Sequence, residues 1–271
     1  MPDSYKVLLI VLFLCFSCLR VAFATEDVEV RSHQIFVILD GSKEAAIRDS
    51  KRMDASATRM ILSVAGEYNA ASVLIAGKNT KVILKPRYNL KPATLHLMYQ
   101  KLKKEARNSK IANFNKAITT AMNLAGDSNR KNGIRTSIIT IIAGKNPPSP
   151  DEYMVDDLIE SGTRLYVIRL VSGELSENWE DWREAAISTN GIFITNDQTD
   201  LLPKTLFDIY LEAINPQLLE VTGNAFQVDR VTTKVTVVTK IQKDIELTLV
   251  SPDNWRVWIK TIKFPVFGTK T

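Results

Sequence analysis

The chain has 271 residues, of which 45% are hydrophobic and 24% are charged, and its formal net charge is +5. Its two cysteines, Cys15 and Cys18, both lie in an apolar segment near the N-terminus, which excludes a disulfide-stabilised fold for the rest of the chain. The remaining length is enough for one large domain, or one domain with a small appendage, built around an ordinary hydrophobic core.

The first predicted element is a secretory signal peptide over residues 1–24. An apolar run at residues 7–19 follows a lysine, and Ala22 and Ala24 supply the small residues of a cleavage site. The run is shorter than the ~20 residues that span a bilayer, which favours cleavage over the alternative of an uncleaved membrane anchor. We therefore expect a secreted, extracellular protein with no membrane span after cleavage.

Apolar, β-rich runs then alternate with amphipathic runs of helical length. Near-continuous apolar strands alternating with helices are typical of a parallel sheet covered on both faces. Two strands joined only by residues 78–80 predict a hairpin, because a parallel pair needs a long crossover. The sequence therefore predicts an α/β fold over residues 25–214, a doubly wound, mostly parallel sheet with one antiparallel edge strand. Strands are expected at residues 35–40, 72–77, 81–86, 136–144, 164–171 and 191–196, and helices at 43–68, 92–106, 113–125, 151–161, 179–188 and 199–214.

The pattern changes after residue 214. Residues 231–240, 244–252 and 254–260 alternate apolar and polar side chains with no helix between them, which is typical of antiparallel strands. We predict a short antiparallel β segment over residues 215–271, too small to be stable unless it packs on another surface.

The order of three motifs carries a family resemblance. VILDGS (residues 37–42) ends the first strand, SKIANFNKAITTAM (109–122) leads into a helix, and IITIIAGKNPP (138–148) forms and follows the fourth strand. In this order they resemble the von Willebrand factor type A domain, over about residues 35–214. The resemblance implies a Rossmann-type fold. With the β segment added, the chain resembles part of the hemicentins and of the calcium-activated chloride channel regulators.

That family usually carries a metal-ion-dependent adhesion site, so the resemblance implies candidate metal ligands. Asp40 and Ser42 match the Asp and the first Ser of its D-x-S-x-S motif, whereas Glu44 replaces the second Ser. The family's Thr and second Asp correspond to Ala112 and Ala143, which offer no oxygen ligand. The resemblance thus predicts a weak or vestigial metal site.

Two interpretations of Asp40, Ser42 and Glu44 stay open. We expect no resident cofactor, with weakly bound Mg²⁺ or Ca²⁺ as the alternative, because Mg²⁺ often binds through one or two carboxylates and several waters. Glu44 is also expected either to fill the coordination place of a ligand or to cap the helix that follows.

Enzymatic activity finds no support in the motifs. His33 and His96 are the two histidines of the chain, and neither lies in an H-E-x-x-H pattern. The AGKN at residues 76–79 and 143–146 lacks the earlier glycine of a phosphate-binding loop, and G-x-G-x-x-G is absent. We therefore expect no enzyme and no nucleotide binding of the Rossmann type.

Charge is segregated along the chain. Lys and Arg dominate residues 78–110, where Glu105 is the one acidic residue, whereas Asp and Glu dominate residues 151–184. We predict an electrically bipolar surface. Its basic part includes a candidate ligand-binding patch for an anionic partner such as a sulfated glycan, although a solvated face is the simpler interpretation. The patch consists of Lys101, Lys103, Lys104 and Arg107.

These observations favour a secreted, non-enzymatic protein-binding or adhesion module with weak or lost cation dependence. Its expected partner is an extracellular protein or a sulfated glycan, and not a nucleic acid. The alternative is a structural or assembly component of an extracellular matrix, which would use the basic face or the edge of the β segment and would form oligomers.

Overall fold

The computed structural model describes residues 33–65, 69–126, 133–171 and 173–214, together with the pairs 221–222 and 225–226. The predicted signal peptide and the predicted strands at 231–240, 244–252 and 254–260 lie outside these residues. Farther along the chain, β7 (Val221–Thr222) and β8 (Ala225–Phe226) form an antiparallel pair. In the described ranges, every helix is too short or too polar to traverse a bilayer.

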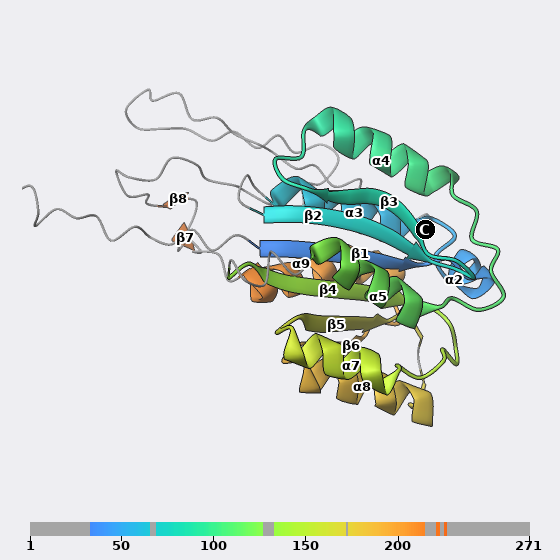
Figure 1. Cartoon of the computed structure of the whole chain (residues 1–271). Coiled ribbons are helices and arrows are strands. Elements are labelled where there is room, and N and C mark those ends of the chain that lie inside the picture. Colours follow the sequence, from blue (N-terminus) through green and yellow to red (C-terminus); the bar gives the residue numbers. More distant parts are fainter. Residues whose placement is uncertain are drawn as a thin grey trace, which may run out of the picture. The chain divides into compact units, whose positions relative to one another are not determined.

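The main sheet has six strands in the order β3-β2-β1-β4-β5-β6, and five of them are parallel to one another, whereas β3 is antiparallel to β2 (Figure 1). The antiparallel β3 lies at one edge, next to the strand that precedes it in the chain. The predicted α/β fold, doubly wound with one antiparallel edge strand, is confirmed. The strands are β1 (His33–Asp40), β2 (Asn69–Ala76), β3 (Lys81–Arg87), β4 (Arg135–Ile142), β5 (Arg164–Arg169) and β6 (Phe193–Thr195).

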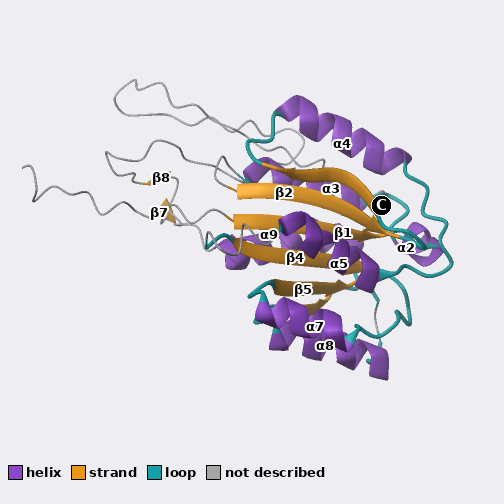
Figure 2. Ribbon diagram, viewed as in Figure 1, coloured by secondary structure: helices purple, strands orange, loops and turns teal. Residues whose placement is uncertain are grey.

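Helices cover both faces of the sheet (Figure 2). The central strand β1 is buried along its whole length, which explains its near-continuous apolar sequence. The edge strand β3 instead has mostly exposed or half-buried residues and contains Pro86, as is typical of an edge position. The helices are α2 (Lys43–Arg48), α3 (Met53–Val64), α4 (Pro92–Lys104), α5 (Phe114–Ala125), α7 (Glu152–Glu160), α8 (Glu177–Ser188) and α9 (Leu202–Ile214), with a 3₁₀ turn, η1, at Thr199–Leu201.

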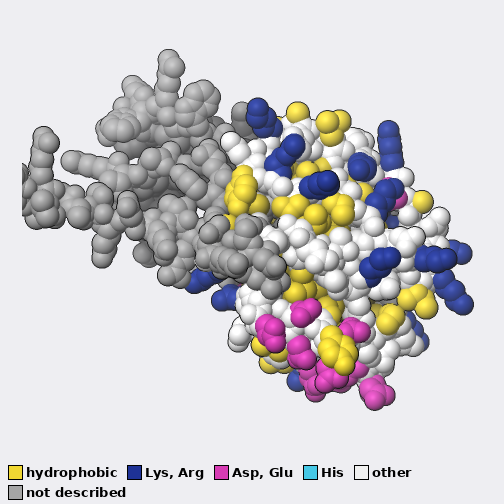
Figure 3. Space-filling model, in the orientation of Figure 1, with side chains coloured by type: hydrophobic (Ala, Val, Ile, Leu, Met, Phe, Trp, Pro, Cys, Tyr) yellow, Lys and Arg dark blue, Asp and Glu magenta, His cyan; other side chains and the backbone are white. Residues whose placement is uncertain are grey.

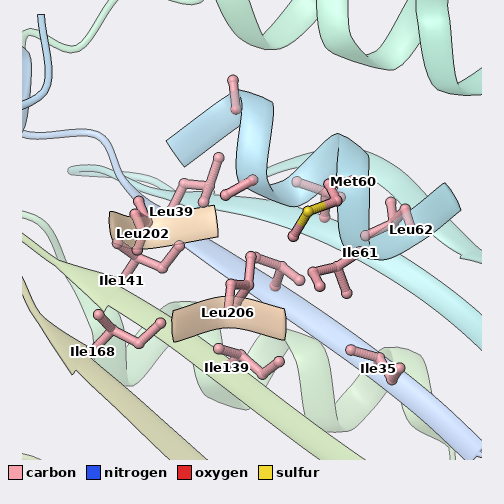
Figure 4. Packing of buried hydrophobic residues seen from close by; sticks show 14 of the residues in the cluster. Ile35, Leu39, Met60, Ile61, Leu62, Ile139, Ile141, Ile168, Leu202 and Leu206 are labelled. Atoms are coloured by element: carbon pink, nitrogen blue, oxygen red, sulfur yellow. The ribbon is translucent and has the colours of Figure 1, made fainter. Parts of the chain in front are cut away.

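Successive side chains of β1 point into two separate cores, because side chains alternate across a strand. Ile35, Val37 and Leu39 pack with α3, α4 and α9 on one face. Phe36 and Ile38 pack with α5, α7 and α8 on the other. In the first core, residues of α3 and α9 close over the sheet (Figure 4), namely Met60, Ile61, Leu202 and Leu206 above Ile35, Leu39, Ile139 and Ile141.

The helix predicted at residues 43–68 is wrong in one respect, because it is interrupted between α2 and α3. The Asp49 carboxylate accepts hydrogen bonds from the backbone N–H groups of Met53 (2.7 Å) and Asp54 (2.9 Å) and so starts a second helix. Arg52 before it has a left-handed backbone, with φ 57°. The apolar periodicity conceals the break because both helices bury residues, including Ala45 and Ala55, in the same core.

Candidate functional site

Two loops meet the end of β1 at the carboxyl edge of the sheet, where ligands bind in open α/β folds. The Gly41 N–H donates to the carbonyl of Ala76 (2.7 Å), and a side chain at Gly41 would approach that oxygen to 2.8 Å. The α4–α5 loop is joined to the same turn, since the Lys43 N–H donates to the Ser109 carbonyl (3.0 Å) and the Ser109 N–H to the Gly41 carbonyl (3.2 Å). Backbone contacts thus bring distant segments together at one crevice.

The crevice contains a pocket of about 200 Å³. The β1–α2, α4–α5 and β4–α7 loops all contribute to it. The three candidate metal ligands and Ala112 do lie together here, as the resemblance implied. The lining residues are Asp40, Ser42, Glu44, Lys110, Ile111, Ala112, Phe114, Ile142, Gly144, Lys145, Asn146, Pro147 and Pro148.

Asp40 is buried at the base of the crevice with only 4% of its surface exposed. One carboxylate oxygen accepts the N–H of Ser42 (2.8 Å), and the other accepts those of Ala143 (2.9 Å) and Gly144 (3.2 Å). Burial raises the pKa of Asp40, and these hydrogen bonds oppose the rise because they favour the charged form. Asp40 therefore fastens the start of the β4–α7 loop to β1.

Ser42 and Glu44 also bind backbone groups. The Ser42 hydroxyl oxygen accepts the Ala45 N–H (3.2 Å) and caps α2. The exposed Glu44 reaches across the crevice, where its carboxylate accepts the Lys145 N–H at 2.5 Å. Glu44 thus holds the loop after β4 and does not cap its own helix, which was one of the two roles expected for it.

The residues at the family's metal positions do not fit a tightly held divalent cation. Mg²⁺ requires oxygen ligands in near-octahedral geometry, whereas Ala112 and Ala143 present methyl groups. Both oxygens of Asp40 and one of Glu44 already accept backbone N–H groups. Within the described ranges, no cluster of three or more His, Cys, Asp or Glu side chains could hold an ion.

Two lysines that were not predicted as residues of this site line the pocket. Lys110 comes from the α4–α5 loop and Lys145 from the β4–α7 loop, and both are exposed. Lys145 belongs to the second AGKN, which lacks the earlier glycine of a phosphate-binding loop. This AGKN directly follows the central strand β4, and that position could have placed Lys145 at the crevice. The rim of the pocket is therefore basic although its base holds the Asp40 carboxylate.

The predicted anion-binding patch is only partly brought together. Lys101, Lys103 and Lys104 are exposed in the last turn of α4. Figure 3 shows several Lys and Arg side chains around the position of α4. The Arg107 side chain is instead 6% exposed, with one guanidinium nitrogen 3.7 Å from a carboxylate oxygen of both Asp49 and Asp54. Arg107 is therefore withdrawn from the surface that the three lysines share.

The buried cluster around Arg107 ties the α4–α5 loop to the beginning of α3. Arg107 also donates to the backbone carbonyl of Asp49. Arg52 contacts Asp54, with 3.0 Å between its Nε and a carboxylate oxygen, and donates to the Glu105 carbonyl (3.3 Å). Burial, followed by the neighbouring Asp54 charge, raises the pKa of Asp49 to about 7. Two arginines thus compensate two buried carboxylates beneath the crevice loop.

One histidine contacts a serine, but the pair lacks the features of a nucleophile site. His33 Nε2 lies 2.9 Å from the Ser137 hydroxyl at the amino ends of β1 and β4, and both residues are buried. Burial and the nearby Arg135 and Arg164 lower the pKa of His33 to about 4. A triad needs a carboxylate to orient the imidazole, and none of the described carboxylates is hydrogen-bonded to His33. The pair is therefore a structural hydrogen bond within the sheet.

The sequence matches no protein-family model and no curated protein. Among solved structures, the chain resembles a von Willebrand factor type A protein from Catenulispora acidiphila, with a TM-score of 0.56 and 8% identity over 69% of this chain and 44% of that one. BatB from Bacteroides thetaiotaomicron has a TM-score of 0.52 and 13% identity, over 68% of this chain and 100% of that one. Proximal thread matrix protein 1 of the mussel byssus has a TM-score of 0.52 and 14% identity, over 69% of this chain and 47% of that one.

The chain spans less than half the length of the first and third of these proteins. At such low identities the likeness extends to the fold alone. The fold is thus of the von Willebrand factor type A kind, as the three motifs predicted.

Proposed function

We propose that the chain is a secreted, non-enzymatic protein-binding module of the von Willebrand factor type A fold, and that its crevice binds a partner without a divalent cation. Secretion rests on the apolar run and cleavage pattern of residues 1–24. Sequencing the N-terminus of the protein recovered from the medium of expressing cells tests it, and a retained leader would contradict it.

One observation carries the cation-independent part of this proposal. Asp40 and Glu44, the two carboxylates that could attract a cation, each accept backbone N–H groups of the β4–α7 loop. These bonds favour the charged carboxylates and fix the loop, which supports a site that keeps its shape without a metal. The positive charge at its rim comes from Lys110 and Lys145, so the partner group that suits it is a carboxylate.

Thermal unfolding with and without metal tests whether a cation belongs to the site. A ligand that binds only the native state must raise the unfolding midpoint. We expect the same midpoint in EDTA and in millimolar Mg²⁺, Mn²⁺ or Ca²⁺. A midpoint raised by a metal in the wild type but not in Asp40→Asn would establish the weakly bound cation instead.

Binding itself is tested with a short peptide that carries one central Asp, and with the same peptide carrying Asn. In NMR titrations in EDTA, we expect the Asp peptide to shift the amide signals of Ile111 and Gly144, which line the pocket. Lys110→Glu with Lys145→Glu should abolish the shifts, because the rim of the pocket loses its two positive charges. The loop should stay in place, because the backbone N–H of Lys145 that holds Glu44 is retained. Equal shifts from both peptides, or none, would refute carboxylate recognition.

A structural role in an extracellular matrix is the second candidate. The observation that favours it is the separation of basic and acidic side chains to different parts of the surface (Figure 3). Such a role requires oligomers, whereas carboxylate binding in the crevice does not depend on the oligomeric state. Sedimentation velocity of the purified protein tests the structural role, because a monomer at every concentration would exclude it, and the peptide titration tests crevice binding separately.

A further inference from the structure

The two ends of the main sheet carry helices of opposite charge. α4 lies beyond the β3 edge, and α7 and α8 lie toward the β6 edge (Figure 1). Figure 3, in the same orientation, shows Lys and Arg side chains around α4 and Asp and Glu side chains gathered over α7 and α8. The bipolar surface predicted from the sequence is therefore a property of the two ends of the sheet.

The exposed face of α4 forms a basic stripe, defined as Leu97, Lys101 and Lys104. These residues are spaced i, i+4 and i+7 and so lie on one side of the helix. Both lysines are exposed, and Leu97 is 69% exposed although it is a large apolar residue. α4 contains no acidic residue, so the stripe is an apolar contact followed by two positive charges.

The exposed face of α7 forms an acidic stripe with the same design, defined as Tyr153, Asp156, Asp157 and Glu160. Its spacing is i, i+3, i+4 and i+7, and all four residues are exposed, Tyr153 to 82%. α7 contains no basic residue. At 1.5 Å per residue, each stripe is about 10 Å long, so the two match in length, in the place of the apolar residue and in opposite charge.

In the part of the chain that the structure describes, no charged residue of either stripe forms an ion pair. The ion pairs found there join other residues, such as Lys81 with Glu105 and Arg183 with Glu180. The stripes cannot meet in one molecule, because they lie at opposite ends of one rigid sheet. Their charges are therefore available to a second molecule.

We propose that the basic stripe of one copy binds the acidic stripe of another, so that this protein associates with itself head to tail. Leu97 and Tyr153 supply apolar contact within a charged surround, the usual arrangement of a protein interface, and the opposite charges fix orientation. After such a contact, one copy keeps its acidic stripe free and the other keeps its basic stripe free, so association continues into open chains or closes into a ring. A sulfated glycan would use the basic stripe alone and would leave the acidic stripe unexplained.

Sedimentation velocity of the full-length secreted protein tests this proposal. At an ionic strength of 0.1 M the screening length is ~10 Å, and at 1 M it falls to ~3 Å. We expect the average mass to increase with protein concentration at the lower salt and to return to the monomer at the higher salt. A monomer at both salts, over the whole concentration range, would overturn the proposal.

Charge reversal locates the interface. Lys101→Glu with Lys104→Glu makes both stripes acidic. Asp156→Lys with Glu160→Lys gives both stripes a net positive charge although Asp157 remains, so each variant alone should self-associate about ten-fold or more weakly. A mixture of the two variants should associate again, as should one chain carrying all four changes. Renewed association in the mixture and in the four-fold variant would exclude misfolding as the cause of the losses. A charge change at the opposite stripe would not repair a misfolded protein.

A matched control uses two exposed basic residues that lie on elements other than α4 and α7, one on β4 and one on α9. Arg135→Glu with Lys204→Glu makes the same change in net charge, and we expect it to leave self-association unchanged. Equal losses in the control and in the basic-stripe variant would refute the named surface, because net charge alone would then explain them. Heparin retention that disappears with Lys101→Glu and Lys104→Glu, in a protein that stays monomeric, would assign the basic stripe to a glycan and refute self-association.

Discussion

Replacing Arg107 by alanine tests whether this residue stabilises the fold or belongs to the surface patch. Removing one partner of a buried ion pair typically costs ~3–5 kcal/mol. Arg52 still contacts Asp54 in the variant, so Asp49 is the carboxylate that loses its cation, and we expect the lower end, about 3 kcal/mol. For a domain of this size, that loss lowers the melting temperature by about 6–12 °C.

The loss should depend on pH in a defined direction. The pKa of Asp49 is already raised to about 7, and removing Arg107 raises it further, because a positive neighbour favours the charged form. A group with a raised pKa in the folded state contributes stability at low pH that is lost as pH rises through that pKa. The difference between wild type and Arg107→Ala should therefore be larger at pH 8 than at pH 5.

Urea denaturation followed by circular dichroism at both pH values measures these differences. Lys104→Ala is the control, since it removes a neighbouring but exposed cation and should change stability by less than ~0.5 kcal/mol. An Arg107→Ala protein as stable as the control would refute the buried cluster, and a loss of heparin retention at unchanged stability would return Arg107 to the surface patch.

Two further predictions concern the sheet. Burial lowers the pKa of His33 from 6.5 to about 4 in the folded state. As pH falls, the unfolded chain therefore binds the proton first, and the free energy of unfolding decreases by about 3 kcal/mol from pH 6.5 to pH 4. In denaturation across that range His33→Gln should lack this part of the slope, and an unchanged slope would exclude His33 as its source. Gly191→Ala would place a Cβ 1.9 Å from the backbone carbonyl oxygen of Leu165, so we expect a loss of about 3 kcal/mol or failure to fold. Gly144→Ala, whose Cβ would meet only a side-chain oxygen at 3.5 Å, is the control, and equal stability of the two variants would contradict the close approach.

The sheet and most of the helices were predictable because local pattern and tertiary environment agree. β1 is apolar throughout since both of its faces are covered, and β3 follows β2 so closely that only a hairpin fits. Asp40, Ser42 and Glu44 could be placed at the crevice because the end of the first strand locates them, and the structure does bring them together.

Other features could not be predicted because they depend on contacts between distant segments. Arg107 looked like one more cation in a basic run, and only the position of Asp49 and Asp54 across the α4–α5 loop buries it. Glu44 was expected to cap its own helix or replace a ligand, whereas its partner, the Lys145 N–H, is far along the chain. The break before α3 depends on the hydrogen bond that the Asp49 carboxylate accepts from the backbone N–H of Met53, and the spacing of apolar residues gives no indication of it.

The loop after β4 is held from below as well as across the crevice. The indole N–H groups of Trp179 and Trp182, buried on α8, donate to the carbonyls of Lys145 (2.8 Å) and Pro148 (2.9 Å). Since Glu44 binds the Lys145 N–H from the other side, the loop has little freedom left to lose on association. A partner that bound the proposed crevice would therefore meet a preorganised surface, and ordering this loop would add only a small entropic penalty to binding.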